Sequence, residues 1–523
     1  MTETAVAPGA LAAETQRRPA PALATLPLIV LAIVKLAIQF AGITRYGFFR
    51  DEFYYMACGE HLAWGYVDQP PLIAFAAWFA RHVFGNSIVS IRLLPVLAGA
   101  AVVFLTGVLA RELGGGKFAQ LLAAAAILLA PAYLAFDAFF SMNAFEPLFW
   151  LLCALIAARI INGGSPKLWL AFGALAGLGL ENKHTMAVFG FALTAGLLLT
   201  GNQSILRSKW LWLGGCIALA LFLPNLIWES QHGWPQIEVV RNAQQYKNLH
   251  IGPLRFLVEQ ILFLNPLALP IWLAGLVWCL FQPQGKRFRC FGWAYLIVLA
   301  VFMVLSGKTY YVVPVYTLVV AAGGVGWESA VSVPWRRLRR AAVLMMVLSG
   351  IATIPFGVPV LPVDVFLRYS GAVPGFRVQT ERDASAALPQ NYADMFGWQS
   401  LAETVARVYH ALPPDEQANC AILAGNYGEA GAIDYYGPGL GLPKAISGHN
   451  NYFYWGPRNY SGSCVILVGL EAADHKSLFG EATLAATTDN PNGVPIEQHV
   501  PIYVCRKPSA PLAELWPQFK LII

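Results

Sequence analysis

The chain has 523 residues, of which 57% are hydrophobic and only 12% are charged, and its net charge at pH 7 is +6. A mean hydropathy of +0.54 over this length excludes an ordinary soluble protein. Long apolar runs recur along the sequence and indicate a polytopic helical membrane protein. Because the excess positive charge falls in short loops between these runs, it is a topology signal and argues against nucleic acid as a partner.

The amino-terminal 25 residues, rich in Ala, Pro and Thr, are predicted to be disordered and cytoplasmic. They show no convincing cleavage site, so we expect the apolar run that follows to remain as a membrane span. A span needs about 20 apolar residues. Eleven segments qualify as candidate spans: 26–43, 89–110, 119–136, 144–162, 168–182, 184–200, 210–228, 257–281, 290–306, 309–327 and 341–360.

Basic loops predict how these spans are oriented in the cell (inner) membrane. With Arg17 and Arg18 in the cytoplasm, every loop assigned to that side carries Lys or Arg. The stretch 168–200, which Lys183 interrupts, is either one broken helix or two spans. One span would place the later basic clusters outside, so we prefer eleven spans in a membrane domain over 26–360. The segments then predicted to lie outside the cytoplasm are 44–88, 229–256 and 361–523.

Residues 361–523 are more polar and predict a soluble, extracytoplasmic α/β domain with a mainly parallel core. Two short apolar runs that end in glycine, 421–425 and 465–469, are typical of buried strands. Helices are predicted over 398–411 and 428–437. Outside the cytoplasm one disulfide would be stable among the three cysteines of this region, but the sequence does not select the pair. The three are Cys420, Cys464 and Cys505.

Two polar segments of this tail are candidate ligand sites. Asn426-Tyr427-Gly428-Glu429 lies at a strand-to-helix turn, where ligands bind in many α/β folds, although an ordinary connection with a capping residue is the preferred explanation. The segment 448–456 alternates aromatic and amide side chains, which suit either a sugar or an aromatic belt that closes over the helices. Its candidate sugar-binding residues are His449, Asn450, Tyr452 and Trp455.

Two adjacent carboxylates, Asp51 and Glu52, follow the first span among the aromatic residues of 48–55. A carboxylate acts as a general base if it reaches the proton of an attacking hydroxyl, and burial near aromatic rings raises its pKa toward the working range. A helix cap is the alternative, because acidic residues stabilise the first turn of a helix. The pair alone does not decide between the two.

Lysines beside later spans are candidate phosphate ligands. Lys308 lies between two apolar runs, where its ammonium group suits a lipid phosphate and where Tyr310 and Tyr311 add hydroxyls. A snorkelling lysine in an aromatic belt is the alternative, and Lys183 has the same two explanations. No histidine spacing matches a metal site, so a divalent cation on the acidic pair is compatible with the sequence but not indicated.

In combination, these motifs resemble the GT-C fold glycosyltransferases that use polyprenyl-phosphate sugars, similar to dolichyl-phosphate-mannose protein mannosyltransferases and the aminoarabinose transferase of lipid A. The likeness covers most of 26–327. It rests on RDEFYY at 50–55, WGYVDQPPL at 64–72, RLLP at 92–95 and GKTYY at 307–311.

The resemblance implies a role for each matching residue. Asp51 would be the catalytic base with Glu52 beside it, and Lys308 would contact the donor phosphate. Relatives often carry His or Lys where Gln69 stands, and many carry Asp near Asn143. The further candidates are Arg92, Lys183, Tyr310 and Tyr311 for the phosphate, and His61, Asp68, Gln69, Asn143 and Glu146 for the substrate loop and its surroundings.

The sequence therefore predicts an inverting glycosyltransferase that moves a sugar from a polyprenyl phosphate to a hydroxyl of a glycan, lipid or protein outside the cytoplasm. A transporter or flippase of a lipid-linked or small polar substrate is the alternative. Such proteins often show internal repeats and charges near the bilayer midplane. Here no convincing repeat is visible and the ionisable residues gather near one face, which predicts one cavity that opens outward.

Overall fold

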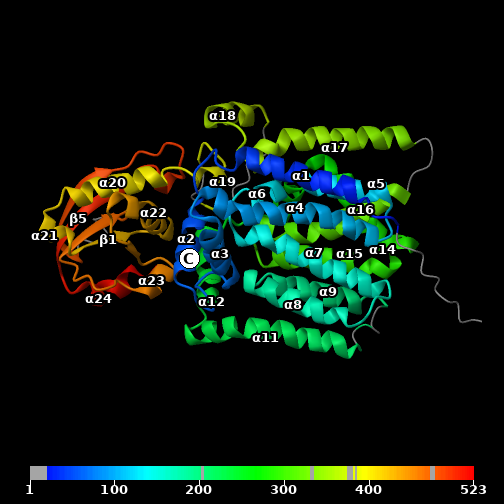
Figure 1. Ribbon diagram of the computed structural model, residues 1–523, viewed down its shortest axis with the longest axis horizontal. Helices are drawn as coiled ribbons and strands as arrows, with labels where there is room; N and C mark the ends of the chain where they lie inside the picture. The colour runs from blue at the N-terminus through cyan, green and yellow to red at the C-terminus, as the bar shows by residue number, and fades with distance from the viewer. Residues whose placement is uncertain are drawn as a thin grey trace, which may run out of the picture.

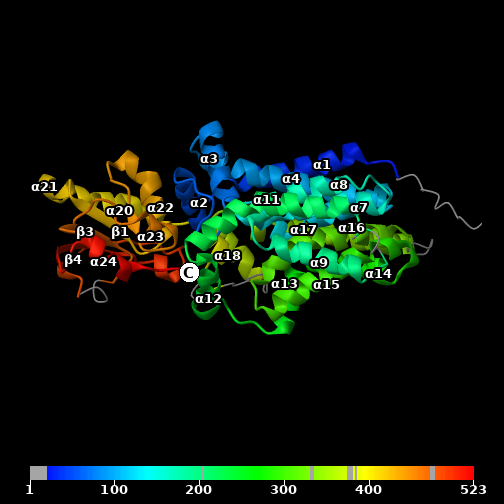
Figure 2. The same ribbon diagram turned by 90° about the horizontal axis from the view of Figure 1, so that it is seen from below.

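The structure is a computed structural model that describes residues 21–201, 205, 207–329, 335–373, 381–382, 386–471 and 477–523. Long, roughly parallel helices form a bundle, and a smaller part with a β-sheet lies at one end of it (Figure 1). Short helices lie between the two parts in both views (Figure 2). Among them are α2 (Arg50–Glu60), α3 (Leu72–Phe84) and α12 (Pro235–Asn242).

Every one of the eleven predicted spans contains a helix. Within the described residues, seven helices are long and apolar enough to cross a membrane, or eight if one bent pair counts as a span. The helices of the bundle are α1 (Thr25–Gly42), α4 (Ile88–Glu112), α5 (Lys117–Leu128), α6 (Pro131–Phe136), α7 (Met142–Ile161), α8 (Leu168–Asn182), α9 (Met186–Leu198), α11 (Lys209–Gln231), α13 (Pro253–Phe263), α14 (Leu269–Phe281), α15 (Arg289–Val304), α16 (Tyr316–Ser329) and α17 (Trp335–Gly357).

Proline divides several predicted spans, because its ring removes a helical hydrogen bond and clashes with the preceding turn. The segment 257–281, expected as one span, is sharply bent: α13 and α14 meet at an angle of 92°. At the break Asn265 has a φ of 69°, and its side chain accepts a hydrogen bond from the Leu267 amide beyond Pro266.

The stretch 168–200, earlier in the chain, consists of two helices that are separated at Lys183.

Outer helices of the bundle expose apolar side chains, as a lipid environment requires. α17 and α11 lie at opposite edges of the bundle in Figure 1, and α1 lies at an edge in Figure 2. Leu26 on α1, Trp212 on α11 and Leu344 on α17 are 72%, 69% and 57% exposed. Since the helices themselves are apolar along their length, an aqueous surface would leave this area unfavourably hydrated. The chain is a multi-pass membrane protein.

A five-stranded sheet organises the carboxy-terminal part, in the order β2-β1-β3-β5-β4. Its strands are β1 (Cys420–Ala424), β2 (Ile446–Ser447), β3 (Cys464–Val468), β4 (Phe479–Thr487) and β5 (Pro501–Pro508). β2, β1 and β3 are parallel, whereas β5 and β4 are antiparallel to their neighbours, so the sheet is mixed rather than mainly parallel. The two predicted strands are present as β1 and β3. The main helices are α20 (Trp398–His410) and α22 (Tyr427–Tyr436), and the shorter ones are α18 (Val363–Ala372), α19 (Gln390–Ala393), α21 (Pro414–Gln417), α23 (Asn451–Trp455) and α24 (Leu512–Leu515).

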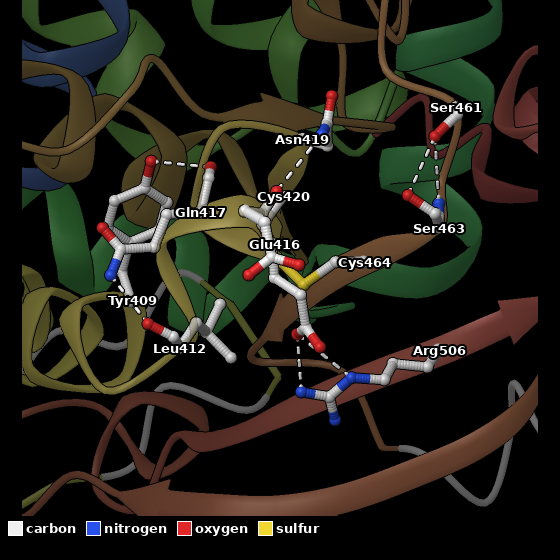
Figure 3. The surroundings of a disulfide bond; sticks show 11 residues. Tyr409, Leu412, Glu416, Gln417, Asn419, Cys420, Ser461, Ser463, Cys464 and Arg506 are labelled. Atoms are coloured by element: carbon white, nitrogen blue, oxygen red, sulfur yellow. Dashed lines mark hydrogen bonds and ion pairs between the residues drawn. A yellow bond between two sulfur atoms is a disulfide. The ribbon is translucent and has the colours of Figure 1, made fainter.

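One disulfide joins two neighbouring parallel strands of this sheet. Cys420 on β1 and Cys464 on β3 are partners in the register, and their sulfur atoms are bonded (Figure 3). Cys505, the third candidate, is free and buried. On the strand next to β3, Arg506 forms an ion pair of 2.7 Å with Glu416, which is also visible in Figure 3. The tertiary structure thus selects the pair that the spacing of the three cysteines left open.

The sheet part packs against the segment that follows α1 through two helices, α2 and α22. Their backbones approach closely at Gly431, where an added Cβ would lie 2.7 Å from the Cβ of Phe53. This contact carries Tyr427, the first residue of α22, toward the start of α2. Residues about 375 positions apart in the sequence therefore meet at one site.

Candidate active site

A cavity of about 220 Å³ lies where the bundle, the loops at one end of it and the tail meet. Its apolar lining comes from α6, the end of α13 and the end of α17, with Ala132, Phe136 and Phe263 as examples. The polar lining comes from the start of α2, the turn before η4 (Thr309–Val315) and the first part of the tail. Its ionisable members are Arg50, Asp51, Lys308, Glu381 and Asp394.

Asp51 lies in the first turn of α2 and faces this cavity with 28% of its side chain exposed. Its Oδ1 accepts a hydrogen bond of 2.8 Å from the hydroxyl of Tyr427, and the Nε of Arg50 is 3.6 Å away. In the described part of the chain, nothing donates a hydrogen bond to its Oδ2. The structure therefore presents a carboxylate that is fixed by one oxygen and open at the other.

Glu52 and Arg92 do not line the cavity, which corrects their assignment to the catalytic and phosphate-binding sets. They form a fully buried ion pair with contacts of 2.9 and 2.8 Å. Glu52 also accepts the backbone amides of Phe49 and Phe140, both at 2.7 Å. The capping role that the sequence left open thus falls to Glu52, because its carboxylate binds the amide of the residue before the helix.

Three cations surround the carboxylate of Glu381. The Nζ of Lys308 is 3.0 Å and the Nζ of Lys247 is 3.6 Å from Oε1, and an Nη of Arg50 is 3.8 Å from Oε2. Burial alone would raise the pKa of Glu381, but these cations outweigh burial and hold the pKa well below its usual range. Burial likewise opposes the charge of Lys308, yet Tyr310 and Glu381 raise its pKa above the ordinary value. The cluster is a ready anion site.

Lys183 lies beside the cavity rather than in its lining. Its Nζ is 2.9 Å from a Glu146 oxygen and donates a hydrogen bond of 2.7 Å to Asn143. It also sits 4.3 Å from the centre of the Tyr311 ring. Of this group Asn143 lines the cavity, as does Tyr310. Glu146 therefore neutralises Lys183, a role different from replacing the aspartate that relatives carry near Asn143.

Substrate-loop candidates surround the site without entering the cavity. Asp68 accepts a hydrogen bond of 2.8 Å from Tyr54, and burial raises the pKa of Asp68 to about 6. Gln69 is fully buried in a turn that Tyr66 closes through backbone hydrogen bonds. His61 stacks on Trp455 at 4.4 Å. These residues shape the loop and its contact with the tail.

Three of the tail candidates for sugar binding, His449, Asn450 and Tyr452, form hydrogen bonds within the tail. Trp455 instead stacks on His61 after α2, which favours the alternative that this segment closes over the helical part. Asn450 exchanges two hydrogen bonds with the backbone of Ile523. Tyr452 donates to Asp434 at 3.0 Å. None of the candidates lines the cavity: His449, Asn450, Tyr452 and Trp455.

The sequence analysis missed several residues that line the cavity or contact its charged lining residues. Arg50 belongs to the RDEFYY motif, and this motif could have identified it as a site residue. Tyr427 belongs to the predicted strand-to-helix turn. Asn426 and Glu429 in that turn form an ordinary capping box, while Tyr427 reaches Asp51. Lys247, Glu381 and Asp394 carry no local pattern that distinguishes them from surface charges.

No three His, Cys, Asp or Glu side chains come together as a metal site would require, within the residues that the structure describes. The nearest charged neighbour of Asp51 is instead Arg50. Any cation on Asp51 would have to share that carboxylate with the guanidinium group.

Comparisons with known proteins agree with this geometry. ArnT from Cupriavidus metallidurans, in a crystal structure bound to undecaprenyl phosphate, matches with a TM-score of 0.59 at 15% identity, covering 92% of this chain and 98% of that one. The Archaeoglobus fulgidus oligosaccharyltransferase, tethered with an acceptor peptide, matches with a TM-score of 0.51 at 12% identity, covering 80% of this chain and 64% of that one. The chain therefore has the GT-C fold of membrane glycosyltransferases, which confirms the resemblance predicted from the sequence.

Sequence comparison adds two partial matches, each over less than half of the chain. A sequence model of the dolichyl-phosphate-mannose-protein mannosyltransferases matches residues 68–228. The lipid A galacturonosyltransferase RgtD of Rhizobium johnstonii is 27% identical over 229 residues, 43% of this chain. That match spans 47% of the length of RgtD, about half of the curated relative.

Proposed function

We propose that the protein transfers a sugar from a polyprenyl phosphate to an acceptor hydroxyl on the extracytoplasmic side of the membrane. One observation carries the proposal: a single cavity combines a half-open carboxylate, Asp51, with a cluster of cations and an apolar lining. The cations suit the phosphate, the apolar lining suits the prenyl chain, and the carboxylate suits a general base. The neighbour ArnT is bound to undecaprenyl phosphate, which supports this class of donor.

In this mechanism Asp51 takes the proton of the acceptor hydroxyl through Oδ2 while Tyr427 holds Oδ1. The acceptor oxygen attacks the anomeric carbon of the sugar from the side opposite the phosphate. The bond between that carbon and the phosphate oxygen breaks, and the configuration inverts. Lys308, Lys247 and Arg50 stabilise the phosphate that leaves, since they already surround one anionic group.

We further propose that the eleven helical segments span the inner membrane with a cytoplasmic amino terminus and an external tail. The disulfide between Cys420 and Cys464 supports an oxidising side for the tail. The basic loops support the same orientation.

The test is Asp51→Asn in purified protein supplied with polyprenyl-phosphate sugars. Because the amide cannot accept the proton, we expect the transfer rate to fall by about 10²–10⁴-fold with unchanged membrane insertion. The matched control is Glu60→Gln, an acidic residue at the other end of α2, where it pairs with Arg81 and Lys444 outside the cavity. Transfer near the normal rate by Asp51→Asn would remove Asp51 as the base.

A further inference from the structure

Asp394 is a buried carboxylate in the cavity wall. Its side chain is fully buried, and among the residues that the structure describes neither Oδ1 nor Oδ2 has a hydrogen-bond partner. The nearest cation, an Nη of Arg50, is 3.6 Å from Oδ1. Buried polar atoms in native proteins are nearly always hydrogen-bonded, so two orphaned oxygens in one side chain call for a ligand that supplies the donors.

The backbone holds Asp394 firmly in this position. Its carbonyl accepts a hydrogen bond of 3.0 Å from the Arg50 amide and another of 2.9 Å from the indole of Trp398. The carboxylate therefore has a fixed place beside the start of α2. A fixed, unpartnered acceptor is what a preorganised binding subsite requires.

A further buried oxygen without a hydrogen-bond partner belongs to another residue of the cavity wall. Ser141 lines the wall and its hydroxyl has no hydrogen-bond partner, although it is buried. Asn391, one helical turn before Asp394, contributes an amide to the same lining. Phe139 adds an aromatic ring that stacks on Phe49 with 4.3 Å between the ring centres. Acceptors, amides and an aromatic face are the groups that bind a sugar ring.

The position of Asp394 relative to the anion cluster selects the donor sugar over the acceptor. The guanidinium of Arg50 lies 3.6 Å from Asp51, 3.6 Å from Asp394 and 3.8 Å from Glu381. The donor sugar is bonded to a phosphate that lies among the cations. Its anomeric carbon must also be within reach of an acceptor hydroxyl held by Asp51. The sugar ring must therefore occupy the space between these groups. That space is bounded by Asp394.

Resting on the proposed function, we propose that Asp394, with Ser141, forms the subsite for the donor sugar and selects a neutral or aminated sugar over a uronic acid. The hydroxyl or ammonium groups of such a sugar donate to both orphaned oxygens. A sugar carboxylate would instead bring a like charge to a buried carboxylate, which costs binding free energy. RgtD, named as a galacturonosyltransferase, would differ from this chain in that preference.

Binding assays with purified full-length protein test this subsite. The probes are undecaprenyl phosphate alone and the same lipid carrying glucose, glucosamine or glucuronic acid. We expect glucose or glucosamine to tighten binding at least about tenfold over the bare lipid, and glucuronic acid to give no gain, as one or two charge-assisted hydrogen bonds allow. Asp394→Asn should lose most of that gain while binding of the bare lipid stays the same.

Asp434→Asn is the control, because Asp434 is a partly buried carboxylate of the tail that is hydrogen-bonded to Tyr452 and the Ala445 amide outside the cavity. It should keep the wild-type ratio between the four probes. The proposal is overturned if Asp394→Asn keeps the gain from the sugar, if the wild type gains nothing from glucose or glucosamine, if glucuronic acid binds best, or if Asp394→Asn changes only the KM of the acceptor. Failure of the wild type to bind even bare undecaprenyl phosphate would instead refute the proposed function and the subsite with it.

Discussion

At the residue scale, neighbouring positions of one helix turn have different chemistry because their surroundings differ. Asp51 is partly exposed and faces the cavity, whereas Glu52 is buried and neutralised by Arg92. Hydrogen bonding likewise distinguishes two carboxylates of the tail, Asp434 and Asp394. Asp434 accepts hydrogen bonds, whereas no described residue donates one to Asp394. The functional assignment of an acidic residue here depends on its partners more than on its burial.

Lys308→Ala should weaken the use of a polyprenyl-phosphate donor. Removing one charge-assisted contact to the phosphate corresponds to about tenfold to hundredfold in donor affinity, while Lys247 and Arg50 retain part of the site. The KM for the donor and the affinity for undecaprenyl phosphate measure the effect. Lys444→Ala, which alters an exposed lysine paired with Glu60, serves as the control. Unchanged donor affinity and rate would exclude Lys308 from the phosphate site.

The free energy of unfolding should decrease as the pH rises, because Asp394 loses its proton. Burial raises the pKa of Asp394 from 3.8 to about 6, with Arg50 opposing the shift. A raised carboxyl pKa stabilises the folded state below pH 4, and this contribution is lost as the pH rises through about 6. Asp394→Asn does not ionise, so its stability relative to the wild type should increase between pH 4 and pH 7, by about 3 kcal/mol at most.

Thermal unfolding of both proteins in detergent at several pH values measures this difference. Asp51→Asn provides the comparison in the same cavity. A stability difference between Asp394→Asn and the wild type that is constant from pH 4 to pH 7 would contradict the raised pKa of Asp394.

At the element scale, the site depends on where helices begin and break. α2 begins at Arg50 because Glu52 caps the Phe49 amide, and that start aims Asp51 at the cavity. The break at Asn265 and Pro266 turns α13 away from α14, and Phe263 at the end of α13 lines the cavity. Breaks in predicted spans thus contribute to the cavity wall that a straight helix would not form.

Breaking the ion pair between Glu52 and Arg92 should unfold this region. Arg92→Ala leaves a buried carboxylate without its partner, which costs about 3–5 kcal/mol. The melting temperature and the yield of monodisperse protein should therefore fall. The double variant Glu52→Gln/Arg92→Met, which buries no charge, should recover part of the loss. If Arg92→Ala melted like the wild type but lost donor affinity, a phosphate-binding role for Arg92 would be restored.

At the scale of the whole molecule, the tail completes a cavity that the bundle begins. Tyr427 supplies the hydrogen bond to Asp51, and Glu381 and Asp394 supply two of the charges in the wall. The tail is held in place by contacts such as α2 on α22 and Trp455 on His61. The site and the tail must therefore lie on the same side of the membrane.

The disulfide tests whether the tail lies outside the cytoplasm. We expect peptide mapping of protein from the native membrane, without reduction, to find Cys420 linked to Cys464 and Cys505 as a free thiol. An oxidising compartment is needed for such a bond to persist. Free thiols at both Cys420 and Cys464 would contradict an extracytoplasmic tail. Reduction should lower thermal stability by about 2–4 kcal/mol, as expected for a loop of 44 residues.

The sequence by itself determined the membrane class, the positions of the helical segments and the two central strands. These features follow from local composition and periodicity, which can be recognised within one short stretch of the sequence. Only the tertiary structure decided that Glu52 pairs with Arg92, that Cys420 bonds Cys464, and that Glu381 and Asp394 enter the site. Their roles depend on contacts over long sequence separations, and neither burial nor charge neutralisation by a distant partner leaves a local pattern.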